Sequence, residues 1–241
     1  MGVVHLADDL VLDREVAVKV IEDRHPALVR REARIMAMVS HESVVQFYAH
    51  GENYLVMEYI DGHPLEIFLK RRISIEAWLD IAFKLCVAVD VMHKAGVVHR
   101  DIKPANSMLR RDHAPVLMDF GLATTVEDLR RSSLSSAYGT PDYLAPEAWR
   151  RALRDPAAAV RADVYALGMS LYQILTGQLP FKSGEALTVF KMHEHVDPSP
   201  PSVFRPGLPA KIDEVLLRSI ARDPGERHQT AEELALEICG L

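Results

Sequence analysis

Short runs of valine and other β-branched residues dominate the beginning of the chain. Residues 3–7 and 16–21 predict one hairpin, and residues 44–49 and 54–59 predict a second. Residues 27–39 depart from this pattern, because their apolar side chains recur at the period of an amphipathic helix. We therefore expect the first 60 residues to form a small sheet with one helix.

Beyond Asp61 the apolar pattern becomes that of helices. Residues 74–94 predict a long helix, whereas residues 97–146 are rich in ionisable side chains and predict a loop-rich segment. Further helices are expected at residues 162–176, 184–193, 210–221 and 230–239. A sheet-rich lobe of residues 1–60 thus precedes a mainly helical lobe of residues 61–241.

Composition restricts the kinds of partner and compartment. The formal net charge is -6, so the sequence indicates neither a nucleic-acid binder nor a protein that adheres to anionic membranes. The sequence contains no apolar run of roughly 18 residues, so we expect no membrane segment within the chain. Cys86 and Cys239 lie far apart in apolar helical patterns, which predicts buried free thiols and a reducing, cytoplasmic location.

Three motifs in the loop-rich segment carry the candidate chemistry. They are HRDIKPAN at residues 99–106, DFG at residues 119–121 and GTPDYLAPE at residues 139–147. In this order and spacing they resemble the catalytic motifs of eukaryotic-type Ser/Thr protein kinases of bacterial character. The resemblance covers residues 1–241 as one kinase domain and implies the α+β, bilobal protein-kinase fold. It also implies ATP and Mg²⁺ as cofactors, with transfer of the γ-phosphoryl group to Ser or Thr hydroxyls of proteins.

The resemblance assigns a role to each charged residue of these motifs. Asp119 and Asn106 correspond to the metal ligands, and both offer the hard oxygen donors that Mg²⁺ prefers. Asp101 corresponds to the residue that orients the substrate hydroxyl and accepts its proton. Lys103 corresponds to the cation that neutralises the phosphoryl group in transit, and a lysine here is typical of Ser/Thr specificity.

Two charged residues of the small lobe complete the implied ATP site. Lys19, at the end of the strand sequence VAVK, corresponds to the lysine that holds the α- and β-phosphates. Glu32 corresponds to its ion-pair partner on the helix. A lysine on an alternating strand is by itself more often a surface residue, and Glu32 stands among arginines typical of a solvated helix face. The downstream motifs favour the catalytic interpretation.

The same resemblance predicts an adenine site at the junction of the lobes. The backbone carbonyl of Glu58 and the amide of Ile60 are expected to hydrogen-bond the ring. The side chains expected to enclose the adenine are those of Val4, Ala17, Met57 and Met108. Each of these residues is also compatible with ordinary core packing, and only its register with Lys19 and Asp119 assigns it to the nucleotide.

The glycine-rich loop departs from the family pattern. Only Gly2 and Val4 correspond to it, and the first strand with its leading glycines has no counterpart. We hypothesise that Met1 is an internal methionine and that the natural chain begins upstream. Residues 3–7 would then form an open sheet edge.

Further residues of the motifs are expected to have structural or regulatory roles. Arg100 would pair with a phosphate in the activation segment, and Asp163 would anchor the catalytic loop. Glu147 and Arg227 would form a buried ion pair. The candidate autophosphorylation sites are Ser132, Ser133, Ser135 and Ser136, although a run of serines is more often plain linker. The histidines are expected to be structural, with His99 packed in the core and His193 and His195 exposed.

Two other functions remain open at this point. A pseudokinase would bind or scaffold without transfer, but the complete set of charged motif residues argues against it. A small-molecule phosphotransferase shares the core scaffold, but residues 139–147 and the helices after them are typical of kinases that seat a peptide. The chain could equally be cytoplasmic throughout or the cytosolic part of a longer membrane-anchored kinase.

Overall fold

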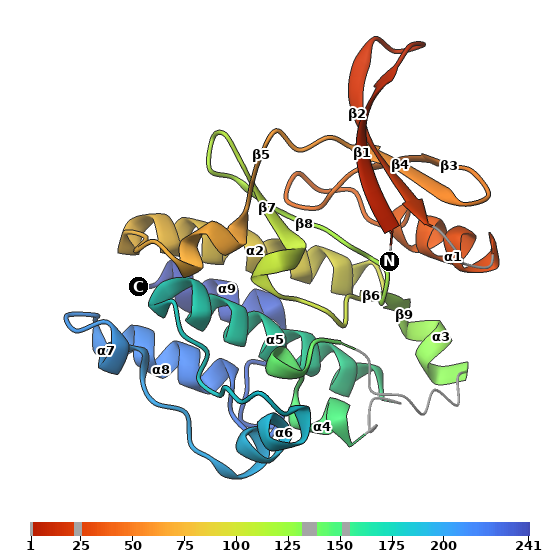
Figure 1. Ribbon diagram of the computed structural model, residues 1–241. Coiled ribbons are helices and arrows are strands. Elements are labelled where there is room, and N and C mark those ends of the chain that lie inside the picture. The colour runs from red at the N-terminus through yellow and green to blue at the C-terminus, as the bar shows by residue number, and fades with distance from the viewer. Residues whose placement is uncertain (1, 22–25, 132–138, 151–154) are drawn as a thin grey trace.

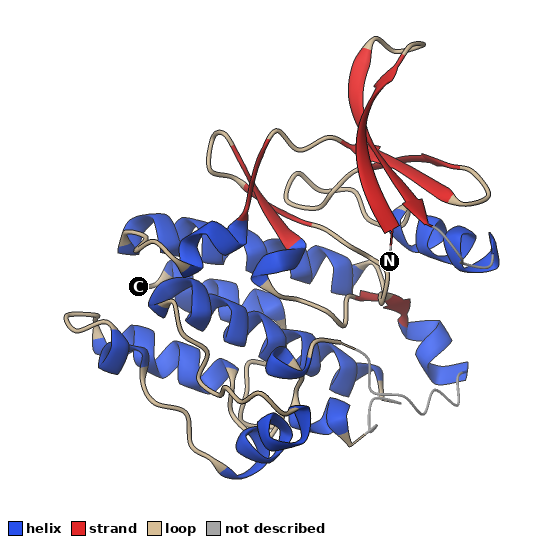
Figure 2. Ribbon diagram, viewed as in Figure 1, coloured by secondary structure: helices blue, strands red, loops and turns tan. Residues whose placement is uncertain are grey.

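The computed structural model describes residues 2–21, 26–131, 139–150 and 155–241, and it divides into two lobes (Figure 1). The long strands lie in the smaller lobe, and helices make up most of the larger one (Figure 2). This is the mixed α+β, bilobal arrangement expected from the sequence.

The small lobe is built on a four-stranded antiparallel sheet in the order β1-β2-β4-β3. Its strands are β1 (Gly2–Asp9), β2 (Arg14–Ile21), β3 (Phe47–His50) and β4 (Tyr54–Glu58). Strand β1 pairs with β2 from Gly2↔Ile21 to Asp9↔Arg14 and is an edge strand within the described residues. Its Val3, Val4 and Leu6 are more than half exposed, which fits the open edge predicted for this segment.

Helix α1 (Pro26–Met36) packs on this sheet. It is shorter than the predicted segment of residues 27–39, since it ends at Met36. Val29, Ala33 and Met36 are buried on one face, as the helical spacing predicts. Glu32 is also only 4% exposed, so its carboxylate faces inward.

Two long helices form the centre of the large lobe. Helix α2 (Ile75–Lys94) begins where the Ser74 hydroxyl accepts a hydrogen bond from the Ala77 amide. Helix α5 (Pro156–Thr176) begins at Asp155, which caps it, and ends at Gly177 in the left-handed conformation. The Trp78 indole of α2 is fully buried and donates a hydrogen bond to the Leu171 carbonyl of α5 at 3.0 Å, which joins the two helices.

The remaining elements surround this pair. The helices are α3 (Val126–Arg131), α4 (Pro146–Trp149), α6 (Ala186–His195), α7 (Pro201–Phe204), α8 (Ala210–Ser219) and α9 (Ala231–Cys239). The 3₁₀ turns are η1 (Leu65–Leu69), η2 (Pro104–Asn106) and η3 (Pro141–Tyr143). The short strands are β5 (Gly62–Pro64), β6 (Val97–Val98), β7 (Ser107–Arg110), β8 (Pro115–Leu117) and β9 (Thr124–Thr125). None of the described helices has both the length and the apolar content that crossing a bilayer requires.

Two expectations about burial were wrong. His193 was expected to be exposed but is 2% exposed, because its ring packs on Phe181 and its Nδ1 is hydrogen-bonded to the Tyr165 hydroxyl at 2.6 Å. Cys239 was expected to be buried but is exposed at the end of α9, whereas Cys86 is buried as predicted. His195 is exposed as expected.

A buried ion pair holds α4 against the large lobe. Both terminal nitrogens of Arg227 donate to the Glu147 carboxylate, at 2.6 and 2.9 Å. The Arg227 side chain is fully buried and its guanidinium also lies over the ring of Tyr165. The pair expected from the sequence is therefore present.

Candidate active site

A cavity of about 550 Å³ lies where the two lobes meet. Its small-lobe wall consists of Gly2, Val4, Ala17, Lys19, Ile21, Glu32, Met36 and Met57. Its large-lobe wall consists of Asp101, Lys103, Ala105, Asn106, Met118, Asp119, Phe120, Gly121 and Leu122. The volume is that of a small-molecule site, and charged groups from distant parts of the sequence converge on it.

Lys19 lies between two carboxylates in this cavity. Its Nζ is 2.8 Å from Glu32 Oε1 and 2.7 Å from Asp119 Oδ1, so strand β2, helix α1 and the DFG segment meet at one ammonium group. Burial alone would lower the pKa of Lys19, but the charges of Glu32 and Asp119 outweigh burial and raise it. Lys19 is therefore a fixed cation.

The Asp101 carboxylate accepts hydrogen bonds on both oxygens. Lys103 Nζ and Asn106 Nδ2 each lie 2.8 Å from Oδ2, and the Thr140 hydroxyl lies 2.8 Å from Oδ1. Burial would raise the pKa of Asp101, but the hydrogen bonds from Lys103 and Thr140 lower it overall. Asp101 is thus ionised at neutral pH, with a hydroxyl group already bound to it.

Thr140 contacts both Asp101 and Lys103, although it was not among the predicted site residues. Its hydroxyl accepts from Lys103 Nζ at 2.6 Å, and its backbone amide donates to Asp101 Oδ1 at 3.0 Å. A side-chain hydroxyl is therefore held between the carboxylate and the ammonium group. The position of Thr140 in the GTPDYLAPE motif was the available signal.

Asn106 and Asp119 fit a divalent cation by their free donor atoms. The Asn106 Nδ2 group donates to the carbonyl and to the carboxylate of Asp101. The Oδ1 oxygen takes no part in these hydrogen bonds and can serve as a metal ligand. The Asp119 carboxylate is 48% exposed, and Lys19 lowers its pKa although burial opposes this. The Met118 amide donates to the Asn106 carbonyl at 2.8 Å, which keeps the two segments adjacent. Both residues line the same cavity and offer hard oxygen donors of the kind that Mg²⁺ prefers.

The backbone that presents these groups is strained and anchored. Arg100 and Asp119 adopt positive φ angles of 69° and 57°, which are costly for residues other than glycine. The buried Asp163 carboxylate accepts the His99 and Arg100 amides, each at 2.8 Å, so it holds the catalytic loop as expected. His93 of α2 donates to the same carboxylate at 2.9 Å. The sequence analysis did not identify His93.

His99 is a packing residue, as the sequence analysis expected. It is 1% exposed, and its Nε2 donates to the Met118 carbonyl at 2.9 Å. Its ring lies 5.6 Å from that of Phe120, between ring centroids. These contacts hold the HRD and DFG segments together.

Comparison with known proteins identifies the family. The sequence profile of the protein kinase domain matches residues 1–236. The chain belongs to the protein kinase family. Members of this family generally use ATP and Mg²⁺, and the cavity between the lobes is the candidate site for them.

Several bacterial kinases are similar over nearly the whole chain. Serine/threonine-protein kinase PknB of Mycobacterium tuberculosis is 37% identical over 99% of the chain and 40% of its own length. The probable serine/threonine-protein kinase SCO3848 of Streptomyces coelicolor is 36% identical, over 99% of the chain and 37% of its own length. PrkC of Bacillus subtilis, also a serine/threonine-protein kinase, is 31% identical, over 99% of the chain and 38% of its own length. The chain thus spans about two fifths of these relatives, and their bacterial origin is consistent with the expected bacterial character.

Not every residue predicted for the kinase's nucleotide reaches the cavity. Glu58, Ile60 and Met108 are absent from its described lining. The Glu58 side chain pairs with Arg110 at 2.7 Å and Ile60 is buried, whereas the predicted adenine contacts are those of their backbone carbonyl and amide. Ile21, Met36, Met118 and Leu122 line the cavity although the sequence did not assign them to the nucleotide.

A second cavity of about 870 Å³ lies beside the active site of the kinase, between α1 and the segment after DFG. Arginines of both lobes line it: Arg30, Arg31, Arg34, Arg100 and Arg131. The Arg31 guanidinium donates to the Thr124 hydroxyl at 2.9 Å, so α1 contacts β9 here. The four candidate serines at positions 132, 133, 135 and 136 lie outside the described residues.

Proposed function

We propose that this chain is an active ATP-dependent protein kinase domain that phosphorylates Ser or Thr hydroxyls of proteins. The observation that supports the proposal best is the convergence of Lys19, Asp101 and Asp119 on one cavity. The names of the similar proteins, which are serine/threonine-protein kinases, support the same reaction.

The residues of the site divide the reaction among them. Asp101 would hold the substrate hydroxyl in line and take its proton, as the Thr140 hydroxyl bound to it suggests. The bond from that oxygen to the γ-phosphorus would form while the bond to the bridging oxygen breaks, and ADP would leave. Lys103 would stabilise the negative charge on the phosphoryl group, and Lys19 would hold the α- and β-phosphates.

The metal and the nucleotide have proposed ligands among the same residues. Asn106 and Asp119 would hold Mg²⁺, which when bound offsets the charge of the phosphates. Gly2, Val4, Ala17 and Met57 line the cavity and would contact ATP, with Glu32 fixing Lys19. The contacts of adenine with Glu58, Ile60 and Met108 stay predictions.

The arginine-lined cavity suggests control by autophosphorylation. Five arginines around one space suit a phosphate group, since guanidinium groups bind phosphate in a bidentate manner. We propose that a phosphoserine among residues 132–136 of the chain itself is the occupant. A phosphate there would connect Arg100, next to Asp101, with α1, which carries Glu32. The cytoplasmic location expected from the sequence also stays a prediction.

Incorporation of labelled phosphate into a generic basic protein, with ATP and Mg²⁺, tests the proposed function. Asp101→Asn should lower turnover by about 10²–10⁴-fold, the usual effect of losing a general base. Asp80→Asn, a control on the exposed side of α2, should leave turnover within about twofold of the wild type. Mapping of the label on the kinase itself locates the autophosphorylated serine.

Two results would contradict the proposal. Equal incorporation by the wild type and Asp101→Asn would remove Asp101 from the reaction. Tight ATP binding by the wild type without any transfer to protein would instead indicate a pseudokinase.

A further inference from the structure

A basic groove lies on the large lobe away from the catalytic cavity. It has a volume of about 160 Å³ and lies between the end of η1, the last turn of α5 and the end of α7. Four cations line it, namely Lys70, Arg71, Arg72 and Arg205. The side chains of Phe68 and Phe204 supply apolar walls. We call this feature the basic groove.

Among the described residues, Arg205 is the one of these four cations whose side chain is bound to other parts of the fold. Arg205 donates to the Ile73 carbonyl at 2.7 Å and to the Leu175 carbonyl at 3.2 Å. Lys70, Arg71 and Arg72 are exposed, and none of them forms an ion pair with a carboxylate in the part of the chain that the structure describes.

Like charges are held close together in the groove. Burial and the neighbouring charge of Arg72 both lower the pKa of Arg205, and only Glu76 opposes them. A cluster of like charges is unfavourable without a counter-charge. The groove is also a basic patch on a chain whose formal net charge is -6. The groove is therefore suited to an anionic group.

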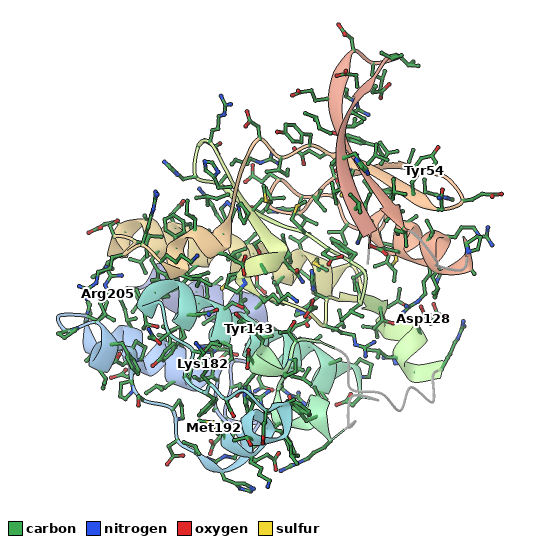
Figure 3. All side chains as sticks on the ribbon, viewed as in Figure 1. Tyr54, Asp128, Tyr143, Lys182, Met192 and Arg205 are labelled. Carbon is green, nitrogen blue, oxygen red and sulfur yellow. The ribbon has the colours of Figure 1, made fainter. Side chains whose placement is uncertain are left out.

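The groove is connected to the active site through two elements. The Tyr143 hydroxyl, three residues after Thr140, donates to Gln173 of α5 at 2.5 Å. Gln173 directly precedes the groove residue Ile174. Turn η1 also contacts η2, which ends at Asn106 of the catalytic loop. Figure 3 shows Tyr143 near the centre of the large lobe and Arg205 at its left end.

The separation is within reach of a short peptide. The Ser170 hydroxyl of α5 donates to the Ile102 carbonyl, next to Asp101, at 3.4 Å, and the groove residues 174–177 follow about 6–10 Å further along the helix. An extended chain covers that distance with roughly three or four residues. A substrate bound at Asp101 can therefore place a neighbouring segment in the groove.

We propose that the basic groove binds an acidic segment of the protein substrate, a few residues from the serine or threonine that is phosphorylated. The proposal rests on the kinase activity proposed above. A peptide fits better than an anionic membrane, because the groove is narrow and concave and the chain as a whole is negatively charged. Phe68 and Phe204 provide contact for apolar side chains between the acidic ones.

Matched peptides test the proposal. Each contains one serine and, roughly four residues away, a short run of glutamates or of glutamines in its place. The run is placed before the serine in one pair of peptides and after it in another, because an extended substrate can cross the large lobe in either direction. For one direction we expect the glutamate peptide to have a KM about tenfold lower than the glutamine peptide at low salt, with kcat unchanged.

Two double variants with equal loss of charge locate the effect. Arg71→Gln/Arg72→Gln should remove the difference in KM between the peptides. Lys191→Gln/Lys211→Gln changes two exposed lysines elsewhere and should preserve it. Raising the ionic strength should reduce the difference in the wild type, because the cations are exposed.

The outcomes separate this proposal from the proposed function. Phosphorylation of both peptides with equal KM would overturn the groove proposal and leave the kinase activity intact. Equal loss of the KM difference in both double variants would also overturn the groove proposal, since the effect would then come from overall charge. If neither peptide is phosphorylated, the proposed function fails, and direct binding of a fluorescent glutamate peptide then decides the groove proposal. Binding of phosphatidylserine vesicles through Arg71 and Arg72, without preference for the glutamate peptide, would assign the groove to membranes and contradict the proposal.

Discussion

Two ion pairs of this kinase domain are alike in chemistry but differ in surroundings. In the cleft, Lys19 is bound to Glu32 and Asp119, and the Asp119 side chain is 48% exposed. In the large lobe, Arg227 is bound to Glu147, and the Arg227 side chain is 0% exposed. The first pair faces a cavity that a ligand can enter, whereas the second is enclosed by protein.

The difference in exposure predicts which of the two pairs matters for catalysis and which for the stability of the fold. A half-exposed carboxylate such as Asp119 keeps water as an alternative partner, so losing its charge costs the fold little. A buried guanidinium has no such alternative, so its partner must stay in place. We therefore expect variants of the cleft pair to change catalysis and variants of the enclosed pair to change the free energy of unfolding.

The largest effect is expected at Asp119. Asp119→Asn removes a charged metal ligand, while Lys19 keeps its ion pair with Glu32. Turnover should fall by about 10³–10⁴-fold, and Tm should change by less than about 3 °C. Steady-state kinetics with saturating ATP and Mg²⁺, together with calorimetry on the same samples, measures both.

The comparison fails if Asp119→Asn unfolds the domain. A fall in Tm of about 10 °C or more would mean that the cleft pair is structural like the enclosed one. Normal turnover would mean that Asp119 does not hold the metal.

Arg227 is expected to give the opposite pattern. Arg227→Gln leaves the Glu147 carboxylate buried without its cation, so the free energy of unfolding should fall by about 3–5 kcal/mol. Arg222→Gln breaks the exposed pair with Asp197 and should cost less than about 0.5 kcal/mol. Urea unfolding measures both, and turnover per folded molecule should stay near the wild-type value. If the two variants cost the same, the enclosed pair does not stabilise the fold as argued.

The motif residues were predictable because their spacing carries the family pattern. The pairs Lys19–Glu32 and Glu147–Arg227, and the hold of Asp163 on the catalytic loop, were all expected from sequence and are present. Helices with a clear cap and apolar period were also predictable, such as the one capped by Ser74.

What the sequence could not decide depends on contacts between distant elements. His193 looks like any polar residue near a helix end, and only Tyr165 of α5 and Phe181 bury it. Helix α5 begins before the predicted residue 162, because Asp155 with a following proline is a start signal that the apolar period alone misses. The adenine contacts of Glu58 and Ile60 depend on how the lobes meet, which no local pattern records.

His193 offers the smallest effect and extends the comparison to a buried group without a charge. Burial lowers its pKa to about 4, so the neutral ring, which is hydrogen-bonded through Nδ1 to the Tyr165 hydroxyl, is the stable form. As pH falls below 6.5, the ordinary pKa of histidine, His193 becomes protonated in the unfolded chain but stays neutral in the folded chain. The stabilisation is complete above that pH and is lost as pH falls towards about 4.

Urea unfolding at pH 8 and pH 5 measures this contribution of His193 to the free energy of unfolding. In the wild type, His193 should lower the free energy of unfolding by about 2 kcal/mol between pH 8 and pH 5. In His193→Gln the decrease in the free energy of unfolding over the same interval should be smaller by that amount. His195→Gln, at an exposed position two residues on, should match the wild type. His228 is also buried with a lowered pKa, so some acid sensitivity should persist in His193→Gln. An unchanged pH dependence in His193→Gln would mean that His193 takes up its proton as readily in the folded chain as in the unfolded one, and enclosure would then not decide which groups of this domain carry charge.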